Sequence, residues 1–446
     1  MITLSMKDLI AEHGVVGAGG AGFPTAVKLA ARAETVIVNA AECEPLLHKD
    51  KELLIHHWTE IRRGLETALD RTGAKRAVIG IKEKHEKLIQ RLAKQLPANT
   101  SICRLADAYP SGDEFILVYD VTGQVIPPGG LPIHLGVIVS NVETLYNVGC
   151  ERPVTHKYLT VAGAVREPLT LRVPVGTPFS SVVQAAGGST VPDFRVLVGG
   201  AMMGRLAQTL DEPVTKTTGG LIVLPASHPL IVRYALGWRE VERKAKAACD
   251  QCSFCTELCP RYLLGHPIEP HKAMRSVGFG GHETRFRHGQ LDENRPTPVS
   301  EGLYCCECNL CSLFSCPEDL DPKNVCVFNK SRMKREASQA GNGACRAHPL
   351  INARRVPITR LTRKLGLSSF ADKAPLSATS LAPARVVIPL RQHIGRACVP
   401  AVTVNQSVRE GQILAAPPDG ALGANLHASI AGTVKSVSEE QIVLES

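Results

Sequence analysis

Two cysteine runs near the middle of the chain restrict its fold more than any other feature. The first run, CDQCSFCTELCP, spaces four cysteines as C-x2-C-x2-C-x3-C and places a proline after the last. Bacterial ferredoxins hold 4Fe–4S clusters with this spacing, and zinc sites fit it poorly. We therefore predict four cluster ligands in this run: Cys249, Cys252, Cys255 and Cys259.

The second run, CCECNLCSLFSCPE, repeats the first three spacings, but its last gap is four residues instead of three. Its predicted ligands are Cys305, Cys308, Cys311 and Cys316, and Cys306 is an extra thiol that could replace a neighbour. In two-cluster ferredoxins the fourth cysteine of each run binds the other cluster. We expect the same exchange here, with Cys316 joining the first run and Cys259 the second. A purely structural role for the iron is the alternative.

The other cysteines show no ligand spacing, and we predict that they are small buried side chains: Cys43, Cys103, Cys150, Cys326, Cys345 and Cys398. No run of eighteen apolar residues suggests a membrane span, and the N-terminus does not read as a signal peptide. We expect a cytoplasmic protein whose 15 cysteines stay reduced.

Near the N-terminus, residues 17–22 read GAGGAG and fit the dinucleotide-binding pattern G-x-G-x-x-G. That pattern needs a strand before the loop, but residues 6–13 suit a short helix better, and the first clear strand is residues 35–39. Glu42 stands 20 residues beyond Gly22, where a ribose-binding acid is expected. The loop is thus either a phosphate-binding loop facing a helix N-terminus or a structural glycine turn.

Length and charge limit the remaining possibilities. A chain of 446 residues should form about three domains. The net charge is +9, and basic residues gather between positions 330 and 364. Aromatic residues make up only 4% of the chain and do not interleave with that stretch, so we predict a basic linker and no nucleic-acid partner.

Four motifs then carry a family resemblance: GAGGAGFPTAVK (17–28), NAAECEP (39–45), YPSGDE (109–114) and SNVETLYNV (140–148). In this order they resemble the RnfC family and, more distantly, the NADH-oxidising flavoprotein subunit of respiratory complex I. The resemblance implies an unusual Rossmann-like domain that binds FMN and NADH. The chain departs from the complex I pattern at Ala41, where that subunit has an acid that helps to hold NADH.

The resemblance also implies roles for individual residues. The FMN phosphate and ring would be lined by Gly17, Gly19, Gly20 and Gly22. Lys28 would reach the flavin, and Phe23 and Glu44 would lie on the nicotinamide side. The rest of the pocket would be formed by Asn39, Glu42, Tyr109, Asp113, Glu114, Asn141 and Thr144. Hydride transfer needs no side-chain acid or base, so we expect no catalytic residue beyond these binding residues.

Two further segments resemble known modules. Residues 158–225 read as short strands and turns similar to the β-grasp SLBB module, and residues 384–446 resemble the lipoyl-like sandwich hybrid that opens RnfC proteins but comes last here. We expect a multidomain α/β protein with a Rossmann-like FMN/NADH domain (1–152), an SLBB domain (153–235), a helical two-cluster ferredoxin domain (236–330), a basic linker (331–383) and a barrel-sandwich hybrid (384–446).

The domain order and the sequences around both cysteine runs resemble the cobalamin reductases of propanediol-utilising microcompartments. This resemblance implies that electrons pass from NADH through FMN and two 4Fe–4S clusters to cob(III)alamin or cob(II)alamin. Implied partners are cobalamin, a cobalamin adenosyltransferase, and the shell or enzymes of a bacterial microcompartment. Two alternatives are an RnfC-like peripheral subunit of a membrane complex and a corrinoid- or ferredoxin-binding module with a structural glycine loop.

Overall fold

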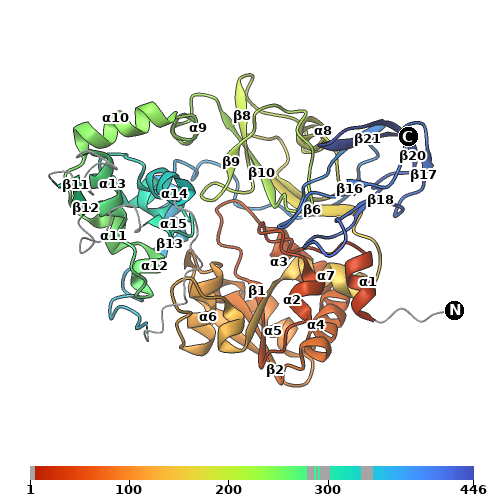
Figure 1. The fold of residues 1–446 in the computed structure, drawn as a ribbon, viewed down its shortest axis with the longest axis horizontal. Coiled ribbons are helices and arrows are strands. Elements are labelled where there is room, and N and C mark those ends of the chain that lie inside the picture. Colours follow the sequence, from red (N-terminus) through yellow and green to blue (C-terminus); the bar gives the residue numbers. More distant parts are fainter. Residues whose placement is uncertain (1–5, 279–285, 288–289, 292–301, 333–344) are drawn as a thin grey trace.

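The computed structural model in Figure 1 describes residues 6–278, 286–287, 290–291, 302–332 and 345–446. The N-terminal domain is built on a parallel sheet with strand order β3-β2-β1-β5. β1 is TVIVNA, and its apolar residues fill both faces: Val36 and Val38 join one core, and Ile37 joins the other. A parallel strand covered on both sides needs such a continuous apolar run. The strands are β1 (Thr35–Ala40), β2 (Arg76–Lys82), β3 (Thr100–Leu105) and β5 (Val137–Asn141).

Helices cover both faces of this sheet (Figure 1). On one face α4 and α7 pack closely at Gly64. Only glycine fits there, because a Cβ would lie 1.9 Å from the Leu145 carbonyl oxygen. On the other face Leu117 and Val118 of α6 pack against Ile37. The helices of this domain are α1 (Met6–Glu12), α2 (Thr25–Leu29), α3 (Lys49–His56), α4 (Trp58–Thr72), α5 (Glu86–Ala93), α6 (Glu114–Thr122) and α7 (Val142–Cys150), with 3-10 turns η1 (Glu83–His85) and η2 (Pro132–Leu135).

The second domain is a mixed sheet with strand order β14-β7-β6-β10-β8-β9. Helix α8 lies on one face, where Phe179 and Val182 pack against Leu159 and Leu221. Its elements are β6 (His156–Gly163), β7 (Leu169–Pro174), α8 (Phe179–Ala185), β8 (Phe194–Val198), β9 (Arg205–Leu206) and β10 (Gly220–Pro225). β14 (Leu376–Ser380) comes from much later in the chain and pairs with β7 in parallel.

The cysteine runs lie in a small helical region with its own core, formed by side chains such as Val241, Met274 and Val325. Its helices are α9 (Pro229–Tyr234), α10 (Trp238–Ala248), α11 (Phe254–Glu257), α12 (Pro260–Leu263), α13 (Pro270–Gly278), the π-helix η5 (Cys311–Ser315) and α14 (Pro322–Arg332), beside the strand pair β11 (Phe286–Arg287) and β12 (Gln290–Leu291). Helices α11 and η5 lie within the cysteine runs, and the other helices flank the runs.

The predicted basic linker packs against its neighbours from residue 345 onward, and positions 333–344 of it lie outside the described residues. Its strand β13 (Val356–Pro357) pairs with β4 (Ala108–Tyr109) of the first domain, and α15 (Ile358–Lys364) buries Leu361. Arg355 forms an ion pair with Asp120. Because Arg354 also forms an ion pair with Glu257 of the first cysteine run, this segment links the cluster region to the first domain.

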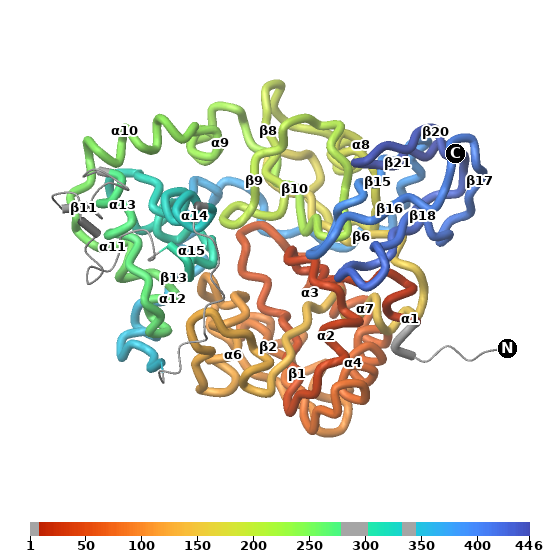
Figure 2. Tube along the Cα trace, viewed as in Figure 1, coloured from red at the N-terminus to blue at the C-terminus, as the bar shows by residue number. Residues whose placement is uncertain are grey.

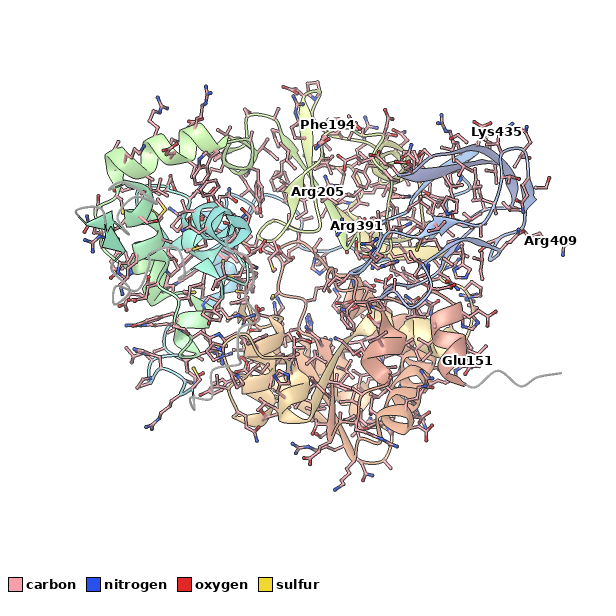
Figure 3. All side chains as sticks on the ribbon, viewed as in Figure 1. Glu151, Phe194, Arg205, Arg391, Arg409 and Lys435 are labelled. Atoms are coloured by element: carbon pink, nitrogen blue, oxygen red, sulfur yellow. The ribbon has the colours of Figure 1, made fainter. Side chains whose placement is uncertain are left out.

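The C-terminal domain consists of two small sheets, ordered β15-β21-β20-β17 and β16-β18-β19. Figure 2 shows it in blue beside the yellow-green second domain and above the first. Arg391 lies on its inner side, whereas Arg409 and Lys435 lie at its outer margin (Figure 3). The strands are β15 (Arg385–Pro389), β16 (Val399–Pro400), β17 (Ser407–Val408), β18 (Ile413–Ala416), β19 (Leu426–His427), β20 (Gly432–Val437) and β21 (Gln441–Glu445).

No helix in the described part of the chain is long and apolar enough to cross a membrane.

Candidate functional site

The glycine loop joins α1 to α2 ahead of β1, so no strand leads into it, as the sequence indicated. The loop closes on itself, because Gly17 N–H donates to the Phe23 carbonyl at 2.9 Å and Gly22 N–H donates to the Gly17 carbonyl at 3.1 Å. The Ala18 N–H donates a hydrogen bond to Thr144 Oγ1 at 2.9 Å, which anchors the loop to the sheet domain. A Cβ on Gly19 would lie 3.2 Å from Asn141 Cβ.

These contacts place the loop over the carboxyl ends of β1 and β5, where Asn39 and Asn141 are register partners. Strand order reverses between these two strands. In open parallel sheets, ligands bind in the crevice at such a switch point. The loop therefore stands where a nucleotide site is expected from topology alone.

The tip of the loop is open. Gly20 has φ +113°, which other residues rarely adopt, and a Cβ there would meet no atom within 4 Å. Residues 19–21 are exposed. Backbone amides in a glycine loop that faces free space suit a phosphate group, so the loop fits the FMN implied by its sequence. Next to it, Lys28 donates to the Val139 carbonyl at 2.9 Å and lies 3.6 Å from Glu114.

A buried charge network supports the loop from below. Glu143 is fully buried, accepts a bond from the Tyr158 N–H at 2.9 Å, forms an ion pair with Lys157 and lies 3.3 Å from Lys49. Lys157 also donates to the Ala18 carbonyl at 3.0 Å. Burial lowers the pKa of Lys157 to about 8, although Glu143 opposes this shift. The sequence analysis did not predict this network. The feature that could have indicated it is Lys157, a lysine within the otherwise apolar strand β6.

Two predicted pocket residues join this network through Asp50. Asn141 donates to Asp50 Oδ2 at 2.7 Å, and the Asp50 N–H donates to the Glu42 carboxylate at 3.1 Å. Burial and the nearby Asp50 raise the pKa of Glu42. Asn39 donates to the Gly112 carbonyl at 2.8 Å. The structure thus brings Asn39, Glu42 and Asn141 to the same edge of the sheet.

Glu44 faces the second domain. Its carboxylate accepts bonds from the N–H groups of Met202 and Met203, both at 2.8 Å. Burial raises its pKa to about 7 in spite of these donors. Glu44 therefore links two domains at the margin of the site, and Phe23 lies half-buried at the base of the loop.

Two other predicted pocket residues reach the cluster region. Tyr109 donates its hydroxyl to the Cys308 carbonyl at 2.6 Å. Asp113 binds the Arg261 guanidinium through two bonds of 2.6 and 3.0 Å, and Arg261 lies 3.8 Å above the Phe115 ring centre. Tyr109 and Asp113 thus connect the sheet domain to both cysteine runs.

The cysteines gather in two neighbouring sets. Burial and the thiols of Cys316, Cys249 and Cys252 raise the pKa of Cys255 to about 12. Burial and the thiols of Cys306 and Cys305 raise the pKa of Cys259. Cys316 is thus close enough to the first run, and Cys259 to the second, for their charges to interact, as the exchanged ligand sets require. Among the described residues, no three His, Cys, Asp or Glu side chains are grouped to hold one metal ion; a 4Fe–4S cluster spreads its thiolates over separate irons.

The backbone also distinguishes Cys305 from Cys306. The residues on either side of the second cysteine have positive φ in both runs: Gln251 and Ser253 in the first, Glu307 and Asn309 in the second. Cys305 therefore occupies the position that Cys249 has in the first run. Its sulfur accepts the Glu307 N–H at 3.3 Å. The backbone register favours Cys305 as the ligand, whereas a hydrogen bond to Cys308 brings the Cys306 thiol to the same set.

The remaining cysteines do not all fit the prediction of small buried side chains. Cys326 and Cys398 are buried, but Cys43, Cys103, Cys150 and Cys345 are only partly buried. Cys326 also has a specific contact, because its hydrogen bond lowers the pKa of Cys305 to about 7.

Four family models match the chain. They are the Nuo51 FMN-binding domain over residues 10–149, the SLBB domain over 158–206, the 4Fe–4S dicluster domain over 248–321 and the RnfC barrel sandwich hybrid domain over 368–446. The predicted set of modules and their order are confirmed. The chain thus has an FMN-binding domain and a 4Fe–4S dicluster domain.

Similar proteins match nearly the whole chain. The cobalamin reductase PduS of Salmonella typhimurium is 42% identical over 98% of this chain and 96% of its own length. The cobalamin reductase PduS of Citrobacter freundii is 40% identical over 99% of this chain and 96% of its own. One component of the Na(+)-translocating ferredoxin:NAD(+) oxidoreductase complex of Acetobacterium woodii is 32% identical over 58% of each chain. This chain belongs to the family of the PduS cobalamin reductases.

Proposed function

We propose that the protein is an NADH-dependent flavo-iron-sulfur reductase that passes electrons through FMN and two 4Fe–4S clusters to cobalamin. The observation that carries this proposal is the direct contact between the glycine-loop domain and the cysteine runs. Tyr109 holds the backbone of the second run at Cys308, and Asp113 holds Arg261, which follows the first run. A flavin at the loop would therefore lie in a domain that contacts the cluster region directly.

Bound FMN would accept a hydride and release single electrons, which converts nicotinamide chemistry into cluster chemistry. The chain's own residues would bind and orient the flavin and the nicotinamide. Amides of the glycine loop would hold the phosphate, and Lys28 would stand at the flavin edge. Phe23 and Glu44 would flank the nicotinamide, without the acid that Ala41 replaces.

The cluster ligands we propose are Cys249, Cys252, Cys255 and Cys316 for one cluster and Cys305, Cys308, Cys311 and Cys259 for the other. The reaction balances because NADH supplies two electrons and each cobalamin takes one: one NADH and two cob(III)alamin give NAD+, one proton and two cob(II)alamin. The Rossmann-like character of the first domain and the domain limits predicted from sequence belong to the same proposal.

We also propose a setting for this reaction. Reduced cobalamin is the substrate of adenosylation, so an adenosyltransferase is the expected partner, inside a bacterial microcompartment of the cytoplasm. The support is the family to which the chain belongs. Fractionation with microcompartments would test it.

An electron-transfer component of a membrane complex is the second candidate, favoured by the 32% identity to the Acetobacterium protein. That match spans only 58% of this chain. The barrel-sandwich domain is C-terminal here, whereas it is N-terminal in RnfC proteins. Recovery of the protein with membranes would favour this candidate.

The proposal is tested by anaerobic purification, followed by quantified flavin and iron and NADH-driven reduction of hydroxocobalamin. We expect one FMN and about eight irons per chain, with cob(II)alamin formed at two per NADH. The same cofactors without corrinoid turnover would refute the reductase and favour the electron-transfer component.

A further inference from the structure

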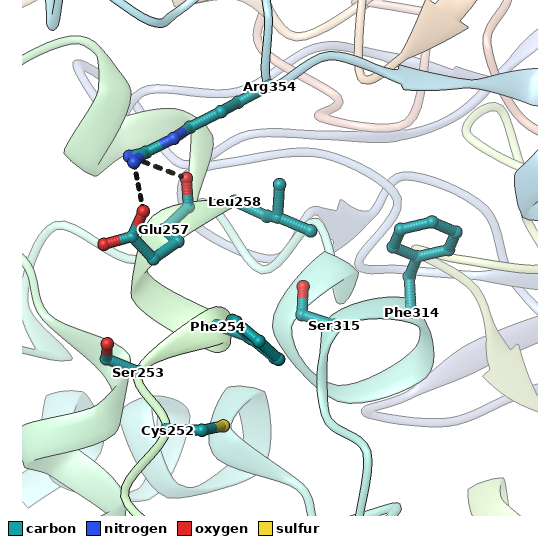
Figure 4. Close-up of a pocket in the computed structure, with 8 residues that line it drawn as sticks. All are labelled: Cys252, Ser253, Phe254, Glu257, Leu258, Phe314, Ser315 and Arg354. Carbon is teal, nitrogen blue, oxygen red and sulfur yellow. Dashed lines mark hydrogen bonds and ion pairs between the residues drawn. The ribbon is translucent and has the colours of Figure 1, made fainter.

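A surface hollow of about 440 Å³ lies beside the first cysteine run (Figure 4). Its walls come from three segments that are distant in sequence: the first run with α11, the π-helix η5, and the returning segment at Arg354. The lining residues are Cys252, Ser253, Phe254, Glu257, Leu258, Phe314, Ser315 and Arg354.

The hollow touches the proposed cluster ligands at one point. Cys252 is exposed and lines it, whereas the ligands Cys255, Cys259, Cys308 and Cys311 are buried. Cys249, Cys255 and Cys316 do not line it, so the hollow touches one ligand of the first set and lies beside the space enclosed by all four.

The second ligand set has the opposite surroundings. Its residue Cys308 contacts Tyr109 of the sheet domain. Electrons from the glycine-loop domain would thus enter at the second set and reach last the first set, whose Cys252 is exposed. An acceptor that meets the chain at Cys252 would take the electron at the end of this path.

The lining indicates what kind of acceptor fits. Phe254 is 54% exposed, and Phe314, which also packs against a buried apolar core, lines the same hollow (Figure 4). Arg354 is neutralised by its ion pair with Glu257, and Ser253 and Ser315 supply hydroxyl groups. Acidic electron-transfer proteins are attracted by uncompensated basic patches, and the described residues that line this hollow include no uncompensated basic side chain. A flat macrocycle with neutral amide arms matches rings beside uncharged polar groups.

We propose that this hollow is the docking site for the corrin ring of free cobalamin, at the exit of the electron path. The inference rests on the reductase function proposed above. Cys249, Cys252, Cys255 and Cys316 would hold the cluster that supplies one electron, and one cobalt ion would go from the 3+ to the 2+ state. No covalent bond forms between protein and corrinoid.

The test compares Phe254→Ser with Leu131→Ser, which removes another exposed apolar side chain (57% exposed) on a loop of the sheet domain. We expect Phe254→Ser to raise KM for hydroxocobalamin about tenfold while NADH still reduces flavin and clusters at the wild-type rate. Leu131→Ser should match wild type in both assays. An unchanged KM in Phe254→Ser with full iron content would overturn the docking site.

Because Phe254 is next to cluster ligands, a second measurement uses the wild-type holoenzyme. Hydrogen–deuterium exchange with hydroxocobalamin should show protection of residues 252–258, 312–316 and around Arg354. Protection elsewhere and none here would overturn the inference. A wild-type enzyme that reduces no cobalamin would instead refute the proposed function, so the two failures are distinguishable.

Discussion

Replacing the buried carboxylate of Glu143 by an amide should destabilise the glycine-loop domain strongly. Glu143 is 0% exposed, contacts the ammonium groups of Lys157 and Lys49, and accepts the Tyr158 N–H. Removing one partner of a buried ion pair costs about 3–5 kcal/mol, because the other charge is left without compensation. Lys157 also holds the Ala18 carbonyl, so the loop should loosen together with the domain.

The assay is thermal unfolding of Glu143→Gln followed by circular dichroism and by flavin release. At about 2–4 °C per kcal/mol for a domain of this size, the transition should fall by roughly 10 °C. Glu66→Gln is the matched control, because the Arg62–Glu66 pair on α4 is exposed and such pairs contribute little. A Glu143→Gln transition within about 2 °C of wild type would refute the network's role.

Three further predictions concern the site. Cys252→Ser should lose one cluster, about four of eight irons, and most cobalamin reduction but keep its flavin; full iron content would show that the ligand assignment is wrong. Gly20→Val should purify with little flavin, whereas Gly123→Val, at another open glycine with positive φ, should keep it; stoichiometric flavin in Gly20→Val would contradict the loop assignment. The raised pKa of Glu44, about 7 against an ordinary 4.5, means that its contribution to stability is complete below pH 4.5 and is lost as pH rises through 7. Glu44→Gln should flatten that part of a stability–pH profile, and an unchanged profile would exclude Glu44 as its source.

Local patterns in the sequence predicted much of the fold. The strand at residues 35–39 became β1, and the helix expected at residues 6–13 became α1. The motif series identified the FMN-binding module, the cysteine spacing identified the dicluster module, and the resemblance of two later segments identified the SLBB and barrel-sandwich modules. Each of these features depends on spacing within a short segment. That is the kind of information a single sequence contains.

Contacts between distant segments were not predictable in the same way. Nothing near Tyr109 indicates that its hydroxyl meets Cys308, and nothing near Val356 indicates that β13 pairs with β4. Glu44 likewise finds its donors at Met202 and Met203 in another domain. Such pairings depend on how whole domains pack, so the path from the loop to the clusters emerged only from the structure.

The central claim is that electrons reach cobalamin through the clusters. The most direct test is anaerobic stopped-flow mixing of NADH with the holoenzyme and hydroxocobalamin, following flavin, cluster and cobalamin absorbance together. We predict that flavin is reduced first, the clusters next and cob(II)alamin last, and that Cys252→Ser keeps the flavin phase, loses about half of the cluster absorbance change and loses most of the cob(II)alamin phase. Cobalamin reduction at an undiminished rate in a variant without clusters would contradict this claim.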